Sequence, residues 1–163
     1  MEEKLKLYMV MLGCTPKGRL TEQHDIFFGI GNSLKNLVSQ MKKFWPEAKG
    51  KIHIDAWREV SAIENFSIKI SAKDSTLNSS SDNLFFINLG GYKENEFKEY
   101  HYKILTVAES MGLASKKARR STFYKLAVSR EPLRTSTTNT GLMWMIFIRY
   151  LIYCLRQLKN YTH

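Results

Sequence analysis

The chain begins with a run of apolar residues, and a second run of the same kind follows in its second half. Leu5–Leu12 and Leu84–Leu89 lack polar alternation, which is typical of strands that are covered on both faces. Each run ends at a glycine, Gly13 or Gly90, and we expect the chain to turn there with positive φ. The pattern therefore predicts two central strands, each followed by a turn.

The two halves of the chain match at a constant spacing of 77 residues, counted from Leu7 to Leu84. In each half a polar loop leads to a second predicted strand, His24–Ile30 and Tyr100–Val107. The register continues without gaps, which indicates two diverged copies of one unit. The further matched pairs are Tyr8 and Phe85, Leu12 and Leu89, Gly13 and Gly90, Leu20 and Phe97, Glu22 and Glu99, His24 and His101, Ile30 and Val107, and Ser33 and Ser110.

A helix is predicted after the second strand of each copy. In the first copy, Asn32 or Ser33 can cap the start of the helix, and Pro46 ends it. The matching stretch of the second copy is Ser110–Tyr124, with a weaker apolar stripe of Met111, Ala114 and Ala118. The stripe of the first helix consists of Leu34, Leu37, Val38, Met41, Phe44 and Trp45.

Two more strands complete the first copy. Lys51–Val60 is the third strand, and Phe66–Lys73 alternates between apolar and polar positions, so one of its faces meets water. We therefore expect an α+β fold in which two tandem, diverged β-β-α(-β) repeats pack into one domain. The predicted organisation is a first unit over 1–72, a polar linker over 73–83, a second unit over 84–125 and an atypical tail over 126–163.

Three histidines, His24, His53 and His101, lie in the repeated motifs. His53 and Asp55 are two positions apart on a predicted strand, so they should project from one face together with Trp57. A histidine beside a carboxylate can act as a general base or bind a metal. These residues are therefore the first candidates for chemistry.

If a pseudo-twofold axis relates the copies, Glu22-His24 and Glu99-His101 face one another and enclose a site with His53-Asp55. The alternative is structural, with each histidine hydrogen-bonded to a neighbouring glutamate to fix a turn. We favour the structural reading, because no close ligand spacing identifies a metal or a cofactor. The catalytic candidates are His24, His53, Asp55 and His101, and the binding candidates are Glu22, His24, Asp25, His53, Asp55, Trp57, Glu99 and His101.

The net charge of +10 suggests an acidic partner such as nucleic acid. Residues 126–163 hold five basic residues and one acid, so the tail supplies +4 of this charge. The remaining cluster, Lys116, Lys117, Arg119 and Arg120, is typical of a solvated helix face, and we expect no nucleic-acid partner. Cys14 and Cys154 follow no metal-ligand spacing and favour a reducing compartment, so the expected location is the cytoplasm.

Three stretches carry a family resemblance. They read Glu22-Gln23-His24-Asp25, His53-Ile54-Asp55-Ala56-Trp57-Arg58 and Phe86-Ile87-Asn88-Leu89-Gly90-Gly91-Tyr92. Together they resemble the bacterial domain of unknown function 1543 family, from about Leu5 to Tyr124. That family is uncharacterised, so the resemblance implies a bacterial protein and supplies no reaction and no cofactor.

From about Leu126 the chain departs from that family, whose pattern implies a His-Ile-Asp-Asp strand and an acidic segment. Shifting the reading frame by two bases turns the codons of Met143–Ile146 into Val-Asp-Asp, and allows His-Ile-Asp-Asp-Lys-Tyr-Gly from Arg134–Thr140. We therefore hypothesise that the tail is read out of frame. The alternative takes Gly141–Leu155 as a genuine buried or membrane-surface helix, since a bilayer span needs ~20 apolar residues.

The leading functional hypothesis is a non-catalytic cytoplasmic module that binds an unknown small ligand or protein at the seam between the repeats. The alternative is a hydrolase-like or metal-assisted enzyme that uses the Glu, His and Asp groups of the repeats. Membrane association is expected only if the apolar tail segment is genuine. An unpaired sheet edge would favour association between copies of the chain.

Overall fold

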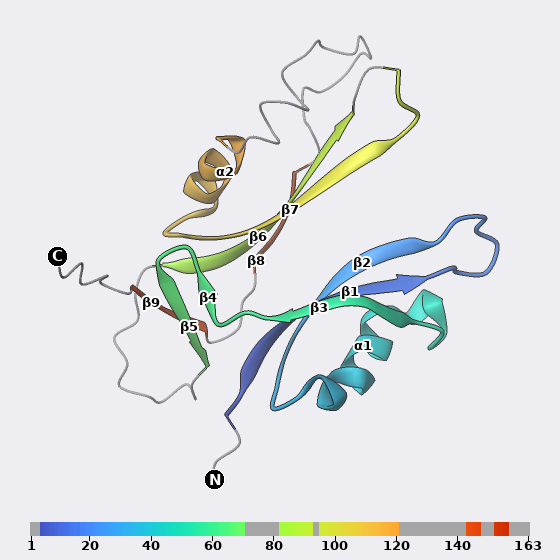
Figure 1. The fold of residues 1–163 in the computed structure, drawn as a ribbon, viewed down its shortest axis with the longest axis horizontal. Coiled ribbons are helices and arrows are strands. Elements are labelled where there is room, and N and C mark those ends of the chain that lie inside the picture. The colour runs from blue at the N-terminus through green and yellow to red at the C-terminus, as the bar shows by residue number, and fades with distance from the viewer. Residues whose placement is uncertain (1–3, 71–81, 93–94, 121–142, 148–151, 157–163) are drawn as a thin grey trace, which may run out of the picture.

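The protein has an α+β fold, and its computed structural model describes residues 4–70, 82–92, 95–120, 143–147 and 152–156. The elements are β1 Lys6–Cys14, β2 Gln23–Gly31, η1 Leu34–Leu37, α1 Val38–Phe44, η2 Pro46–Ala48, β3 His53–Glu59, β4 Ala62–Ile63, β5 Phe66–Ile70, β6 Asn83–Tyr92, β7 Glu99–Ala108, α2 Met111–Arg119, β8 Met143–Phe147 and β9 Ile152–Arg156. Three antiparallel sheets have the strand orders β2-β1-β3, β7-β6-β8 and β4-β5-β9 (Figure 1).

Two of these sheets pack face to face, and each carries a helix on its outer face. Between the sheets, the rings of Phe28 and Phe86 meet edge to face with their centroids 5.3 Å apart. On the outer faces, Leu37 and Met41 pack against the first sheet, and Ala114 packs against the second. The fold is therefore layered in the order α1, first sheet, second sheet, α2 (Figure 1). We call the contact between the sheets the seam.

The residues that line the seam change from apolar to polar along the strands. Side chains two apart on a strand share a face, so the cross-strand pairs that line the seam follow from the register. They are Leu7–Ile30, Met9–Phe28, Met11–Ile26 and Gly13–His24 in the first sheet, and Leu84–Val107, Phe86–Leu105, Asn88–Lys103 and Gly90–His101 in the second. The seam therefore starts as an apolar core and ends in polar groups.

The β1–β2 and β6–β7 hairpins pair in the same register at the spacing of 77 residues. Leu7 opposes Ile30 as Leu84 opposes Val107. The strands that the sequence predicts in both halves are thus present with equivalent neighbours. The duplication itself stays an inference from this register and from the sequence match.

The helix predicted after β2 is divided into η1 and α1. The Ser33 hydroxyl makes no capping hydrogen bond, and a 3₁₀ turn with about 3 residues per turn precedes the α-helix. Leu37 and Met41 are buried as expected, but Val38 and Phe44 are 42% and 41% exposed. The tighter first turn rotates the stripe, so both side chains are partly exposed, although the Phe44 ring still meets the buried Phe27 ring edge to face at 5.5 Å.

In α2, the Ser110 hydroxyl accepts a hydrogen bond from the Leu113 N–H at 3.3 Å, which caps the helix. Ala114 and Ala118 are buried as predicted. Met111 is 52% exposed, so the prediction that it joins the stripe is wrong. The predicted end of this helix, 121–124, lies outside the described residues.

Gly13 and Gly90 do not turn the chain. Both lie inside strands, β1 and β6, and the glycines with positive φ in the described part of the chain are Gly18 and Gly50. The predicted turns at these two positions are therefore wrong. The strands continue through them because both glycines still pair with residues of the neighbouring strand.

The β4–β5 hairpin connects the two halves through Glu64, whose φ is 53°. The Glu64 carboxylate accepts a hydrogen bond from the Thr106 hydroxyl at 2.6 Å and lies 3.0 Å from the Lys117 ammonium. The same ammonium donates to the Val107 carbonyl oxygen at 2.5 Å, at the edge strand β7. These contacts fasten a hairpin of the first half to a strand and a helix of the second.

The tail contributes two strands that the sequence did not predict. β8 pairs with β6, and β9 pairs with β5. The alternative prediction of a helix over Gly141–Leu155 is therefore wrong for the described residues of that range, which form strands. Among the described residues, no helix is both long enough and apolar enough to cross a membrane. The hypothesis of an out-of-frame tail stays a prediction.

Replacing Glu64 with Ala should lower the free energy of unfolding by about 1–3 kcal/mol, because the buried Thr106 hydroxyl would lose a charged acceptor. Urea unfolding followed by circular dichroism measures this change. The matched control is Glu109→Ala, at an exposed glutamate after β7, which should change the midpoint little. Equal midpoints for the two variants would contradict the role given to Glu64.

Candidate functional site

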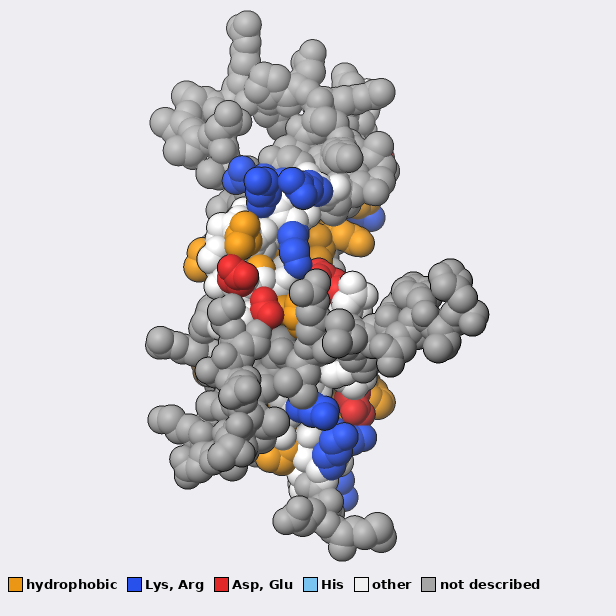
Figure 2. All heavy atoms as spheres, turned by 90° about the vertical axis from the view of Figure 1, so that its left-hand side faces the viewer, with side chains coloured by type: hydrophobic (Ala, Val, Ile, Leu, Met, Phe, Trp, Pro, Cys, Tyr) orange, Lys and Arg blue, Asp and Glu red, His pale blue; other side chains and the backbone are white. Residues whose placement is uncertain are grey.

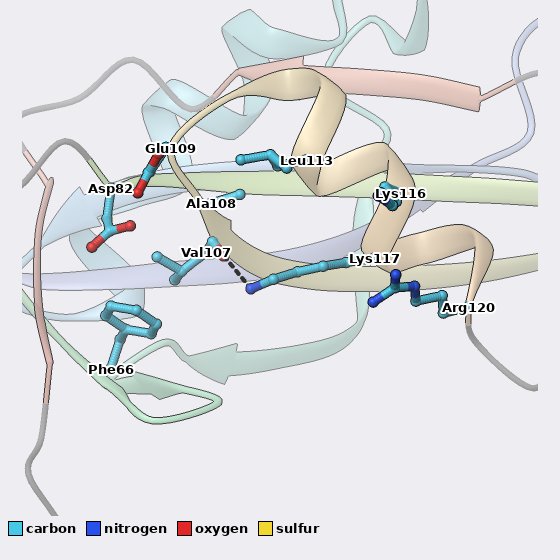
Figure 3. A pocket seen from close by; sticks show the side chains of 9 residues that line it. All are labelled: Phe66, Asp82, Val107, Ala108, Glu109, Leu113, Lys116, Lys117 and Arg120. Carbon is cyan, nitrogen blue, oxygen red and sulfur yellow. Dashed lines mark hydrogen bonds between the residues drawn. The ribbon is translucent and has the colours of Figure 1, made fainter.

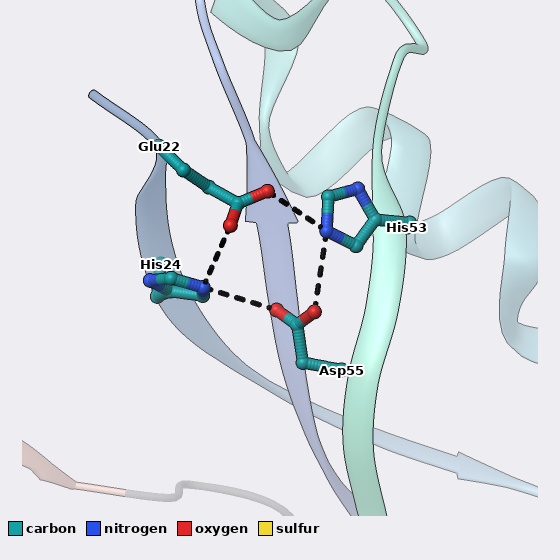
Figure 4. A network of polar contacts seen from close by, with 4 residues as sticks. All are labelled: Glu22, His24, His53 and Asp55. Atoms are coloured by element: carbon teal, nitrogen blue, oxygen red, sulfur yellow. Dashed lines mark ion pairs between the residues drawn. The ribbon is translucent and has the colours of Figure 1, made fainter.

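Four side chains form a closed ring at the polar end of the seam. Glu22 directly precedes β2, His24 lies at the start of β2, and His53 and Asp55 come from β3. Figure 4 shows the two imidazoles alternating with the two carboxylates around the ring. We call this arrangement the four-residue ring.

Each imidazole contacts both carboxylates through its Nε2 atom. The His24 Nε2 lies 3.2 Å from Asp55 Oδ2 and 3.6 Å from Glu22 Oε2. The His53 Nε2 lies 3.0 Å from Glu22 Oε1 and 3.2 Å from Asp55 Oδ1. An Nε2 atom that faces carboxylate oxygens acts as a donor, so in the neutral ring the lone pair lies on Nδ1.

β3 has a β-bulge at Asp55, one of the four ring residues. Met11 opposes Ala56 while Leu12 opposes Ile54, so Asp55 is the extra residue. The bulge reverses the alternation beyond it, because one added residue changes which face each side chain occupies. Ordinary alternation thus keeps His53 and Asp55 on the ring side of the sheet, and the bulge sends Trp57 to the opposite face.

Two predicted site residues lie on the opposite face of the first sheet. Trp57 opposes Val10 of the outer cluster, and its ring lies 6.1 Å from that of Tyr8. Asp25 opposes the buried outer residue Leu12, and its carboxylate accepts a hydrogen bond from the Ile26 N–H. The expectation that Trp57 shares a face with His53 and Asp55 is wrong, because of the bulge.

Gly13 lies beneath the ring, between His24 and His53 in the sheet. A Cβ atom at this position would lie 2.5 Å from both the Asp55 Oδ2 and the His53 Nε2 atoms. The ring therefore requires a residue without a side chain here. At Gly90, the matching position, a Cβ would approach Glu99 Oε1 at 2.9 Å.

The second sheet brings the other predicted pair to the seam. The His101 Nε2 lies 3.5 Å from Glu99 Oε2, and its Nδ1 lies 3.2 Å from the Asn88 amide nitrogen. The Asn88 Oδ1 atom is buried and finds no hydrogen-bond partner among the described residues. Lys103, which opposes Asn88, has no ion-pair partner among the residues that the structure describes.

A cavity of about 350 Å³ lies between the sheets and is lined by Met11, His24, Asn88, His101 and Lys103. The two sequence-matched histidines therefore meet at one cavity, as the seam hypothesis expects. Asn88, Lys103 and Met11 were not predicted. Asn88 interrupts the otherwise apolar run Leu84–Leu89, and this interruption was the signal that could have identified it.

The two halves of the site are unequal. β8 pairs with β6 as β3 pairs with β1, but its sequence, Met143–Phe147, contains no histidine and no acid. Within the described residues, Glu99 and His101 thus lack a counterpart of His53-Asp55. The ring belongs to the first half alone.

The ring combines the donor types of a first-row metal site, two imidazole nitrogens and two carboxylates. In the described part of the chain, no three histidine, cysteine, aspartate or glutamate side chains are already placed to hold a metal ion. As it stands, the ring fixes the orientation of two imidazoles. Such an orientation suits ligand recognition or proton transfer.

A second cavity, of about 340 Å³, lies beside α2 (Figure 3). It contains none of the predicted site residues, and its Lys117 is already bound to Glu64 and to the Val107 carbonyl. Figure 2 shows basic side chains gathered over α2 on this side of the molecule. Lys42 and Lys43 belong to α1 in the opposite outer layer (Figure 1), so the two basic groups do not join.

Two groups outside the ring and its cavity have shifted pKa values. A hydrogen bond to Glu59 raises the pKa of the Lys6 ammonium, and a hydrogen bond to Glu96 raises the pKa of the Tyr100 phenol. Both groups are solvent-exposed surface partners of a carboxylate. These shifts reflect local pairing and do not mark a reactive centre.

Replacing Gly13 with Ala should open the four-residue ring while the fold stays intact, because the displaced atoms are the ends of exposed side chains. The side-chain ¹⁵N resonances of His24 and His53 should move, and those of His101 should not. Gly90→Ala is the matched control and should leave the ring resonances unchanged. Unmoved His24 and His53 resonances in Gly13→Ala would contradict this account of the ring.

Comparison with known proteins identifies a similar fold. The crystal structure of a protein Il1583 from Idiomarina loihiensis has a TM-score of 0.57 and 19% sequence identity, and the match covers 94% of this chain and 99% of that one. At this identity the likeness shows the fold alone. None of the curated proteins matches the chain.

The family model for DUF1543, Domain of Unknown Function, matches residues 19–70. This range includes all four members of the ring. The resemblance of the sequence motifs is therefore confirmed over residues 19–70, which match the model of the DUF1543 family, a domain of unknown function.

Proposed function

We propose that this chain is a non-catalytic cytoplasmic module that binds a small polar ligand at the polar end of the seam. The supporting observation is the cavity of about 350 Å³ to which both halves contribute a histidine, His24 and His101. Small-molecule sites are commonly cavities of about 300–1,000 Å³ in which a few placed polar groups fix the ligand. The cysteine content favours the cytoplasm.

The cavity lining favours a ligand that carries both a negative group and a hydrogen-bond donor. Lys103 offers a cation, and the buried Asn88 oxygen needs a donor. A buried polar group without a partner costs about 1–3 kcal/mol, so a ligand that satisfies it gains affinity. Met11 adds an apolar contact. Small hydroxy acids and amino acids combine these features at a size that the cavity accepts.

The test is a titration of the ¹⁵N-labelled full chain with hydroxy acids and amino acids, followed by NMR. At least one probe should shift the resonances of His24, Asn88, His101 and Lys103 together. Lys103→Met should weaken that probe at least ~10-fold, because a charged hydrogen bond contributes about 1.5–3 kcal/mol. Dissociation constants from the same titration give the comparison.

The matched control is Lys69→Met, at an exposed lysine of β5 away from the cavity. It should bind the probe as the unchanged chain does. Shifts confined to residues outside the cavity, or equal affinity in Lys103→Met, would reject the seam as the binding site.

A hydrolase-like or metal-assisted enzyme is the second candidate. The observation that favours it is His24, whose Nε2 contacts two carboxylates while the imidazole lines the cavity. An imidazole oriented in this way can accept a proton at Nδ1 from a bound molecule. Conversion of a bound probe, lost in His24→Gln with binding retained, would favour this candidate over a non-catalytic module.

A further inference from the structure

The four-residue ring gathers two imidazole nitrogens and two carboxylates in a small space. Imidazole is a common ligand of Zn, Fe and Ni, and carboxylates complete many such sites. The donors come from two strands that flank β1, so the sheet itself holds them apart at a fixed spacing. Figure 4 shows the four side-chain heads gathered around one small space, with each imidazole in contact with both carboxylates.

The spacing of the donors suits a first-row ion. Zinc bonds of about 2.0–2.2 Å in tetrahedral geometry separate neighbouring donors by about 3.3–3.5 Å. The nitrogen–oxygen distances around the ring are 3.0, 3.2, 3.2 and 3.6 Å, on both sides of that range.

The donor atoms of the ring do not converge on a single point. Each imidazole faces a different oxygen of each carboxylate, so the donors surround a centre without meeting at it. This arrangement explains why no ready metal geometry is found among the described residues. The four side chains are 26–52% exposed, so the carboxylates can turn to bring one oxygen each toward the centre.

The charges balance for a dication. Two carboxylates give the ring a charge of −2 when both imidazoles are neutral, and a divalent ion cancels it. The Nε2 proton of each neutral imidazole moves to Nδ1 through solvent, which frees the Nε2 lone pair for the metal. No proton is lost overall. Gly13 leaves the floor beneath these donors free of a side chain.

We propose that Glu22, His24, His53 and Asp55 form a binding site for a divalent first-row metal ion. The site is distinct from the ligand-binding role of the cavity and does not rest on it, although His24 borders both. The second half has no such site in the described residues, because only Glu99 and His101 are present there. One ion per chain is therefore expected.

The test uses Zn²⁺ and the full chain without a histidine tag. Calorimetry should give one tight Zn²⁺ site per chain, and Co²⁺ in its place should show the visible absorption of a four-coordinate centre. Asp55→Asn and His53→Ala should each weaken Zn²⁺ at least ~10-fold, the loss that even an outer-shell partner causes. Bound Zn²⁺ should also raise the unfolding temperature of the unchanged chain.

Two controls separate a ring site from general histidine binding. His101→Ala removes a histidine outside the ring and should keep the Zn²⁺ affinity. Gly13→Ala keeps all four donors but places a Cβ within 2.5 Å of two of them, so it should lose the site. Circular dichroism confirms that each variant is folded, and Glu22→Gln, which keeps the side-chain size, replaces any variant that is not.

The proposal is overturned if the unchanged chain binds Zn²⁺ no better than Asp55→Asn, or if His101→Ala loses the ion as His53→Ala does. Failure of the seam ligand would leave these results unaffected. Lys103→Met reports on the seam ligand alone, because Lys103 takes no part in the ring. The two proposals can therefore fail separately.

Discussion

The rest of the structure depends on the packing of two sheet faces against each other. β1 and β6 each have a helix on one side and the opposite sheet on the other, so both of their faces must be apolar over most of their length. At the row of Gly13 and Gly90 the sheets no longer need apolar side chains, because water reaches that end. The ring and the cavity lie where the core stops, and they stay ordered because the packed rows hold the strands that carry them.

Much of the fold could be predicted from the sequence, because strands and helices that pack into a core have recognisable local patterns of apolar residues. The apolar runs within β1 and β6 are such patterns, and so is the helical stripe that includes Leu37 and Met41. No local sequence pattern predicted the face-to-face packing of the two sheets or the strands β8 and β9. They follow from pairing between residues far apart, such as Ile68 with Cys154, and no periodicity encodes a partner.

The site was predicted in part, and the misses have physical causes. The Glu-x-His and His-x-Asp spacings predicted that each pair lies on one face, and the structure brings the two pairs into contact. Trp57 was assigned to the wrong face because a bulge is invisible to a period-two rule. Gly13 was predicted to form a turn because glycine tolerates positive φ. In the structure it lies within a strand, and a side chain there would clash with Asp55 and His53. Asn88 and Lys103 went unnoticed because the search followed the residues repeated in both halves, and the positions that match them in the first half are Met11 and Ile26.

The pairing of β5 with β9 has a consequence for the order of folding. The strands β1, β2 and β3 lie within residues 6–59, so the ring can assemble from contacts that are close in sequence. β5 pairs with β9, whose residues lie more than eighty positions later in the sequence, as in the pair Phe66 and Arg156. Closing so long a loop is entropically costly and slow. During synthesis the first half therefore emerges and folds early, and the β4-β5-β9 sheet closes only after residues 152–156 have left the ribosome.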